Sequence, residues 1–413
     1  MTAPPEQQLD PHRPSTAERR RSIEHVARPR TAGAGLDVFA VEESAAQLVW
    51  SDLPSGPVEL QVFGPGGAQA PVVVHHPGGP GVVELTGLDA GASHRVEVRS
   101  RRSRSGAALR RSFRTQPAPP GDELFRFATL NDLHIGREHR RSSAPSANPS
   151  GTGADEPTPR EMAAAAFDDA LAWGAQQVIV KGDVCEESFE GNWDQAATVF
   201  GDAPVPVHLL PGNHDTGTKR HVEPEDAARA RGLALTRGVA HLDVPGLRVV
   251  LADSCRDGSG WGTLRARSTE VADLAAQAHA DGLGVFVATH HQPQRFTLPL
   301  YWPHGIPGPD ARSFARTLRD TTPNALISSG HTHRCRVRSV GGVAWSEVAA
   351  TNHFPATWAG YRVFAGGLMQ VVRRTSGPAA LAWSEHGRQA LRGVWALWAT
   401  GTISDRSFTL RWS

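Results

Sequence analysis

Between residues 125 and 333 the sequence repeats one arrangement five times: a short apolar run ends directly in side chains that can bind a metal ion. Runs of this length and composition predict buried strands. The segments are 125–134, 178–183, 205–215, 285–291 and 325–333. In an open α/β sheet, ligands collect outside the carboxyl ends of the strands, so we expect these strand ends to converge on one crevice.

The sequence around these segments has the alternation typical of an α/β domain. After a Pro-rich linker at 117–121, apolar runs of strand length alternate with helical patterns at Glu161 to Gln176 and Glu270 to Ala280. Residues 142–159 form a low-complexity insert, which we expect to be a mobile loop. Residues 361–413 alternate apolar and polar side chains, and we expect them to close the sheet rather than form a further domain.

The residue types at the strand ends indicate their chemistry. Carboxylate, imidazole and amide ligands suit Mn²⁺, Fe²⁺ or Zn²⁺ rather than a soft thiolate site. Two such ions about 3.5 to 4 Å apart clamp a phosphoryl group, generate a hydroxide and neutralise the charge that develops on phosphorus. This chemistry needs a carboxylate that bridges the ions and several neutral imidazoles. Glycines at 182, 212 and 330 allow the chain to turn sharply and approach the ions closely.

Five motifs occupy the strand ends in a fixed order. They are D-x-H at Asp132 and His134, G-D at Gly182 and Asp183, G-N-H-D at Gly212 to Asp215, H-H at His290 and His291, and G-H-x-H at Gly330 to His333. Together, across 125 to about 350, they resemble the calcineurin-like metallophosphoesterase superfamily. The resemblance implies an α/β fold, a four-layer αββα sandwich, that holds two divalent ions and hydrolyses phosphoesters by attack of a metal-bound hydroxide.

The same resemblance implies a role for each motif residue. Asp132, His134 and His333 are implied to bind the first ion, Asp183 to bridge, and Asn213, His290 and His331 to bind the second. His214 is implied to assist the leaving group as an acid or charge stabiliser, held by Asp215. A neighbouring carboxylate raises the pKa of an imidazole and fixes its orientation, which supports the catalytic pair.

Other histidines and a cysteine lie near the motifs. In the H-H block the superfamily pattern favours His290 as the ligand, because His291 would point to the opposite face of an extended chain. Cys185 is either a redox-sensitive thiol near the metals or, as we favour, a buried structural residue. Ordinary surface or core roles are expected for His139, His221, His304, His353 and His386, and a strand end for His75 and His76.

The N-terminal part of the chain differs in pattern. Residues 1–34 predict a disordered tail, 35–118 a small all-β sandwich and 122–413 the metallophosphoesterase domain. Trp50, residues 88–98 and the exit at 113–117 resemble the fibronectin type III family, of immunoglobulin-like architecture, although His94 replaces its corner tyrosine. The arginines between 99 and 114 are either a phosphate-binding strip or, as we favour, a charged edge hairpin that deters aggregation.

The subfamily follows from two positions. A β domain before a metallophosphoesterase domain is also the plan of purple acid phosphatases, but those enzymes place a tyrosine where this chain has Cys185 and lack a histidine at the position of His134. The chain instead resembles class III cyclic nucleotide phosphodiesterases. We therefore expect a phosphodiesterase with two Mn²⁺ or Fe²⁺ ions, Zn²⁺ being possible. A phosphomonoesterase (an acid phosphatase or nucleotidase) is the alternative, and a non-catalytic protein-binding scaffold is a third.

Two aromatic segments follow metal-binding blocks. Residues 301–306, with Tyr301 and Trp302, and residues 354–358, with Trp358, either stack a nucleobase or pack as loops on the sheet edge.

Composition limits the partners. With 43 basic and 42 acidic residues the formal charge is +1, so no global field draws the chain to nucleic acid or an anionic membrane. Three cysteines make no disulfide framework, and the arginines at 19–21 have no apolar core behind them that would make an export signal. We expect a cytoplasmic protein that acts on a small phosphoester, with a nucleotide as one candidate, without a membrane partner.

Overall fold

The computed structural model describes residues 35–100, 108–137, 157–294, 303–388 and 390–412. The predicted tail, nearly all of the 142–159 insert, His139, Tyr301, Trp302 and the arginines at 101, 102 and 104 lie outside these residues.

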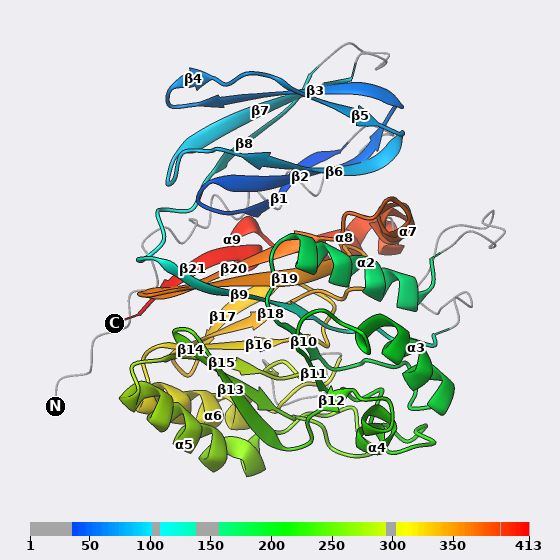
Figure 1. Ribbon diagram of the computed structural model, residues 1–413, viewed down its shortest axis with the longest axis vertical. Coiled ribbons are helices and arrows are strands. Elements are labelled where there is room, and N and C mark those ends of the chain that lie inside the picture. The colour runs from blue at the N-terminus through cyan, green and yellow to red at the C-terminus, as the bar shows by residue number, and fades with distance from the viewer. Residues whose placement is uncertain (1–34, 101–107, 138–156, 295–302, 389, 413) are drawn as a thin grey trace.

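The first described residues form two antiparallel sheets, drawn in blue in Figure 1. One has the order β1-β2-β6; in the other, β4-β3-β7-β8 are neighbours and β5 also pairs with β3. The strands are β1 Leu36–Val41, β2 Ala45–Leu53, β3 Gly56–Gly64, β4 Gly67–Ala68, β5 Val72–His76, β6 Gly79–Thr86, β7 Ser93–Ser100 and β8 Leu109–Arg114. Alternate apolar residues of both sheets, Trp50 among them, form one buried core.

Two sequence interpretations of this region are supported by its contacts. His94 Nε2 lies 3.1 Å from the Asp89 carbonyl oxygen five residues upstream, so the imidazole makes the backbone contact typical of a corner tyrosine. Of the arginines between 99 and 114, Arg99 and Arg110 pair with Glu97 on β7, next to the edge strand β8. For these two arginines the pairing favours the charged edge hairpin over a phosphate-binding strip.

The rest of the described chain contains a seven-stranded and a six-stranded sheet. The first has the order β12-β11-β10-β9-β19-β20-β21, with β9 Glu123–Leu130, β10 Val178–Lys181, β11 Val207–Leu210, β12 Ala234–Leu235, β19 Thr357–Phe364, β20 Gly367–Arg374 and β21 Ser407–Arg411. The second has the order β13-β14-β15-β16-β18-β17, with β13 Val239–Val244, β14 Leu247–Ala252, β15 Gly284–Ala288, β16 Ala325–Ser329, β17 Arg336–Val340 and β18 Val343–Glu347.

The two sheets pack face to face with helices outside them. One apolar core lies between the sheets and includes Phe127 and Phe286. Helices α2 Pro159–Ala172, α3 Glu190–Phe200 and α4 Pro224–Arg229 cover the seven-stranded sheet, and α5 Ser268–Ala280 and α6 Gly308–Thr321 cover the other (Figure 1). On α6, Ala311, Phe314, Ala315 and Leu318 recur at helical spacing and are buried. The predicted four-layer αββα sandwich is confirmed.

The C-terminal residues extend the seven-stranded sheet, as the sequence predicted. β20 pairs with β19 and β21, and helices α7 Pro378–Arg388, α8 Val394–Thr400 and α9 Ile403–Arg406 connect β20 to β21. The N-terminal sheets lie against this part of the molecule (Figure 1): Gln47 Nε2 donates to the Arg374 carbonyl, and the Arg374 amide donates back to Gln47 Oε1 at 2.8 Å.

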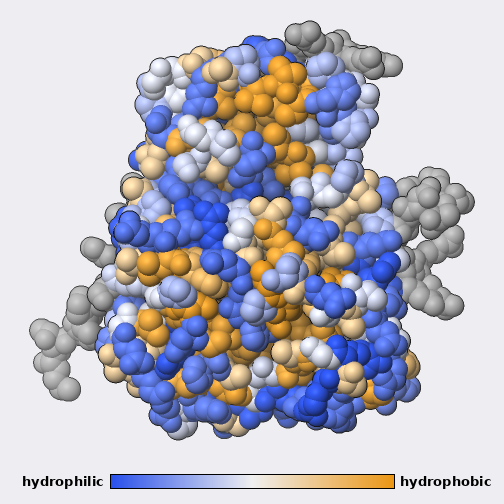
Figure 2. Space-filling view, viewed as in Figure 1, coloured by the Kyte–Doolittle hydropathy of each residue, from blue (hydrophilic) through white to orange (hydrophobic). Residues whose placement is uncertain are grey.

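The exposed surface is mainly polar, but Figure 2 shows an apolar area over the N-terminal sheets. Val72 and Val73 of β5 are among the exposed large apolar side chains. No helix within the described residues is long and apolar enough to cross a bilayer.

Candidate metal centre

The five predicted strands are present, but they belong to two sheets. β9, β10 and β11 lie in the seven-stranded sheet, whereas β15 and β16 lie in the other. The predicted convergence of the strand ends takes place across two sheets, as expected for a four-layer sandwich. The Asp132 amide donates to the Gly182 carbonyl within one sheet, and the His331 amide donates to the Asp132 carboxylate across the two.

The backbone at these strand ends has an uncommon conformation. Within the described chain, six residues other than glycine have a positive φ, and five of them are predicted ligands. Their φ values are 53° at Asp132, 51° at His134, 49° at Asp183, 66° at His331 and 51° at His333. This left-handed region is sterically costly for residues with a Cβ, and such outliers concentrate at functional sites.

One group of ligand atoms brings together Asp132, His134 and His333. His333 Nε2 lies 3.6 Å from Asp132 Oδ1 and 3.4 Å from His134 Nε2. His134 Nε2 in turn lies 3.7 Å from Asp183 Oδ2. The four side chains thus surround one point with nitrogen and oxygen atoms.

A second group lies on the other side of the Asp183 carboxylate. His290 Nε2 is 3.4 Å from Asp183 Oδ1 and 3.2 Å from Asn213 Oδ1. The ring centroids of His290 and His331 are 4.9 Å apart. Asp183 therefore contacts both groups, as a bridging carboxylate would.

Three of these imidazoles are oriented by hydrogen bonds on their outer side. His134 Nδ1 lies 2.6 Å from Glu186 Oε2, His290 Nδ1 lies 2.8 Å from the Lys181 carbonyl oxygen, and His331 Nε2 lies 2.9 Å from the His304 carbonyl oxygen. An oxygen acceptor fixes the proton on the outer nitrogen and leaves the other ring nitrogen with a free lone pair. These residues therefore fit metal ions of the kind that nitrogen and oxygen ligands prefer.

The pKa shifts in the centre also fit a site for a cation. Burial would raise the pKa of Asp183, but His290 and His214 hold it well below its ordinary value. Burial would lower the pKa of His290, but Asp183 outweighs burial and raises it to about 9. The carboxylates thus favour positive charge between them.

Asp215 is among the groups that raise the pKa of His214, but the expectation that it orients the imidazole by a hydrogen bond is wrong. Both Asp215 oxygens accept backbone hydrogen bonds: Oδ2 from Val184 and Gly212, and Oδ1 from Cys185 at 2.8 Å. Asp215 thus ties together the loops after β10 and β11. His214 Nδ1 instead lies 3.0 Å from the Glu186 carbonyl oxygen and 3.7 Å from Glu186 Oε2. Burial lowers the pKa of His214, but Asp183 and Glu186 outweigh burial and raise it.

A family model agrees with this geometry. The model for the calcineurin-like phosphoesterase matches residues 125–335, about half of the chain. The chain belongs to the calcineurin-like phosphoesterase family. A comparison with curated protein sequences finds no significant match.

Solved structures resemble this phosphoesterase at low sequence identity. Purple acid phosphatase PPD1 from yellow lupin (Lupinus luteus) seeds is 12% identical with a TM-score of 0.43, over 82% of this chain and 72% of the other. A putative 5'-nucleotidase from Staphylococcus aureus is 12% identical with a TM-score of 0.38, over 61% and 53%. Vps29 from Entamoeba histolytica with bound zinc is 14% identical with a TM-score of 0.29, over 60% and 91%.

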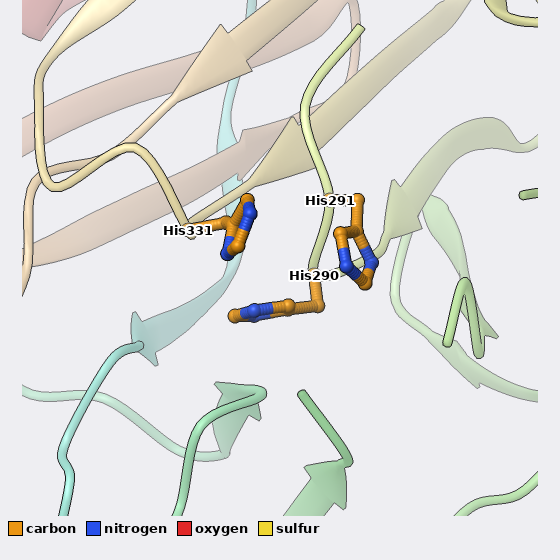
Figure 3. Close-up of side chains that lie close together, drawn as sticks. All are labelled: His290, His291 and His331. Atoms are coloured by element: carbon orange, nitrogen blue, oxygen red, sulfur yellow. The ribbon is translucent and has the colours of Figure 1, made fainter. Parts of the chain in front are cut away.

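His291 lies beside the predicted ligands rather than on the opposite face. Its ring centroid is 4.9 Å from that of His290 and 4.8 Å from that of His331, and Figure 3 shows the three rings around a common space. His291 Nδ1 lies 2.9 Å from Ser254 Oγ. The alternation rule fails here because the chain after β15 has left the extended strand at Ala288.

The aromatic segment at 354–358 does not form a stacking surface. Trp358 is 2% exposed within β19, packs edge-on against Trp173 at 5.7 Å and lies under the Arg373 guanidinium. The stacking interpretation of Trp358 is therefore wrong, and packing on the sheet is confirmed.

Cys185 is buried, and burial raises the pKa of its thiol well above the ordinary value. An inert structural cysteine is therefore the interpretation that its surroundings support.

Sequence reasoning missed two residues that support the phosphoesterase site. Glu186 orients both His134 and His214, and its signal was a carboxylate three residues after Asp183. Lys181 is fully buried between the sheets, where its Nζ donates to Ser328 Oγ at 2.8 Å and to the Ser329 carbonyl. It joins the end of β10 to the end of β16, and only the packing of the sheets reveals this contact.

Proposed function

We propose that this protein is a dinuclear metal-dependent phosphodiesterase. The observation that carries the proposal is the convergence of inward-facing lone pairs from both sheets around the Asp183 carboxylate. We assign Asp132, His134 and His333 to the first ion, Asp183 to the bridge, and Asn213, His290 and His331 to the second. Mn²⁺ or Fe²⁺ suits this donor set, and Zn²⁺ is the third candidate.

The residues of the chain divide the work of hydrolysis. The two ions, when bound, supply an activated water nucleophile and positive charge for the phosphoryl group. His214, whose side chain is 37% exposed, reaches the substrate side of the site and protonates or stabilises the departing oxygen. Its backbone amide donates to Asp183 Oδ1 at 2.9 Å, which fixes the imidazole relative to the bridging carboxylate. Asp215 keeps the two loops in place.

Two positions support a diester as the substrate, with cyclic nucleotides as the first class to test. His134 occupies the first motif, as in the class III phosphodiesterases that the sequence resembles. Cys185 stands where a purple acid phosphatase has its tyrosine ligand; its side chain is buried, and its backbone forms a β-bridge with Ile135.

Three further assignments belong to this proposal. Residues 35–118 and 122–413 are taken as two domains. The three cysteines are buried and free, which suits a reducing cytoplasm. The substrate is a small phosphoester, with no membrane partner.

The test is hydrolysis of an aryl phosphodiester against the matching phosphomonoester by protein reconstituted with Mn²⁺. We expect a higher kcat/KM for the diester. A preference for the monoester would replace the diesterase with a phosphatase or nucleotidase and keep the metal centre. No hydrolysis of either ester, by protein that has bound two ions, would favour the scaffold.

A further inference from the structure

The metal centre is partly exposed around His134. The Asp183 and His290 side chains are only 2% and 0% exposed. Four side chains around His134 are more accessible: His214 at 37%, Glu186 and Arg137 at 26%, and His333 at 19%. We call these four residues the mouth of the site.

Arg137 is the positively charged residue of this mouth, and two neighbouring side chains contact its guanidinium. Its Nη1 donates to His353 Nε2 at 3.1 Å, and its Nε lies 3.9 Å from Glu186 Oε1. The His353 ring stacks on His333, with centroids 5.2 Å apart and planes 30° from parallel. The guanidinium is therefore one side chain away from the ligands proposed for the first ion.

The guanidinium keeps donors for a ligand. Glu186 gives its Oε2 to His134 at 2.6 Å, and the 3.9 Å between its Oε1 and Arg137 Nε exceeds a hydrogen bond. Within the described ranges, no hydrogen bond engages Arg137 Nη2. A planar guanidinium with free N–H groups binds phosphate oxygens in pairs, which a side chain locked in ion pairs does not.

We propose that Arg137 binds the non-bridging phosphoryl oxygens at the mouth and thereby selects dianionic over monoanionic phosphates. The inference rests on the proposed function, because it concerns the relative affinity of that same site for different phosphates. A phosphodiester carries one negative charge, whereas a phosphomonoester or inorganic phosphate carries up to two. One fixed positive charge interacts more strongly with the second class. The monoester product of a diesterase would then bind tightly and inhibit it.

The test is calorimetric binding of inorganic phosphate to protein loaded with Mn²⁺, with Arg137→Gln compared to wild type. We expect phosphate to bind about 10- to 100-fold more weakly to the variant, as loss of a charge-assisted hydrogen bond implies. Metal content and melting temperature should not change. In parallel, KM for an aryl monoester should rise by a larger factor than KM for the matching diester.

Arg220→Gln is the matched control. Arg220 has the same 26% exposure, but its guanidinium bonds to the Thr216 carbonyl and Glu223. The Arg220→Gln substitution removes one positive charge, as Arg137→Gln does, but leaves the proposed Arg137 contact in place. Phosphate affinity should therefore stay near that of wild type. Arg137→Lys should restore part of the affinity, because it keeps the charge and loses the paired donors.

Equal loss in Arg220→Gln and Arg137→Gln would overturn the proposal, since the effect would then be one of general charge. Unchanged phosphate affinity in Arg137→Gln would also overturn it and would leave the phosphodiesterase assignment standing. A wild type that binds two ions but neither binds phosphate nor hydrolyses either ester would overturn both. If Arg137→Gln loses metal, Arg137→Lys decides, because it keeps the charge and removes the paired donors: phosphate affinity equal to that of wild type would overturn the proposal.

Discussion

Two regions of this molecule gather carboxylates at low exposure, and they balance the charge in different ways. Where the N-terminal sheets meet the seven-stranded sheet, guanidinium groups face the acids. Arg362 Nη1 donates to Glu42 and Glu43 at 3.0 and 2.7 Å, and its Nη2 donates to Glu123 at 2.6 Å. Arg373 donates to Glu42 at 2.8 Å and contacts Glu84. Every acid of this interface has a permanent cation.

In the metal centre the acids face imidazoles instead. Asp132 and Asp183 have His333 and His290 as neighbours. His290 directs a lone pair inward because its outer nitrogen, Nδ1, is bonded to the Lys181 carbonyl oxygen. An arginine neutralises the charge of its carboxylate partner without any added ion. Carboxylates that share a site with neutral imidazoles keep their negative charge, which a bound cation can neutralise. The comparison separates an acidic cluster whose charge is balanced by arginines from one whose side chains fit a metal ion.

The largest expected effect is that of Asp183→Asn, which removes the carboxylate common to both ligand groups. Metal affinity should fall by more than the ~10–100-fold that loss of an outer hydrogen-bond partner costs, and hydrolysis should be abolished. Metal content by atomic emission and hydrolysis of the aryl ester measure both. If Asp183→Asn kept both ions and its activity, Asp183 would not be the shared carboxylate, and the contrast with the arginine-paired interface would fail.

At the interface, Arg362→Met should act on stability instead. It leaves Glu42, Glu43 and Glu123 without a shared cation, so the free energy of unfolding should fall by about 3 kcal/mol. Urea denaturation measures the change. Arg229→Met is the control, because its partners lie on the surface and such pairs contribute about 0.5 kcal/mol. Metal affinity should not change in either variant.

Glu186→Ala tests the outer partner of His134. Without it the imidazole loses its fixed orientation, so affinity for the first ion should fall about 10–100-fold while the second ion is retained. Titration with Mn²⁺ measures the two affinities. Glu187→Ala, which removes only a surface pair with Lys219, should leave both unchanged. Equal loss of both ions would contradict the separate assignment of His134.

The smallest expected effect is a pH dependence of the interface. Burial would raise the pKa of Glu123, but hydrogen bonds from Arg126 and Arg362 outweigh burial and lower it. A carboxyl whose folded pKa lies below its unfolded value, about 4.3, stabilises the fold above that pH and loses the contribution as pH falls through the folded pKa. The urea midpoint from about pH 6 to about pH 3 should therefore fall more steeply in wild type than in Glu123→Gln.

The elements of the fold were largely predictable from local pattern. Apolar runs marked β9, β10, β15 and β16, and helical spacing marked α2 and α5, because burial on one or both faces leaves a periodic trace in the sequence. The motifs likewise identified Asp132 and Asp183 as residues of one site. What the pattern could not supply was the partner of each side chain. His214 was paired with Asp215 because they are adjacent in sequence, whereas Glu186 holds it.

The sequence by itself determined which residues are candidates for the chemistry, because a ligand must be a carboxylate, imidazole or amide and must follow a strand that ends at the site. Only the tertiary structure decided how those residues meet. Two sheets had to stack before His290 and His331 could face Asp183 and Asp132, and before Lys181 could join Ser328. The stacking also brought His291 beside His290 and His331, while packing against Trp173 on the outer face of the seven-stranded sheet buried Trp358. Such contacts depend on packing between segments far apart in the chain, and no local pattern encodes them.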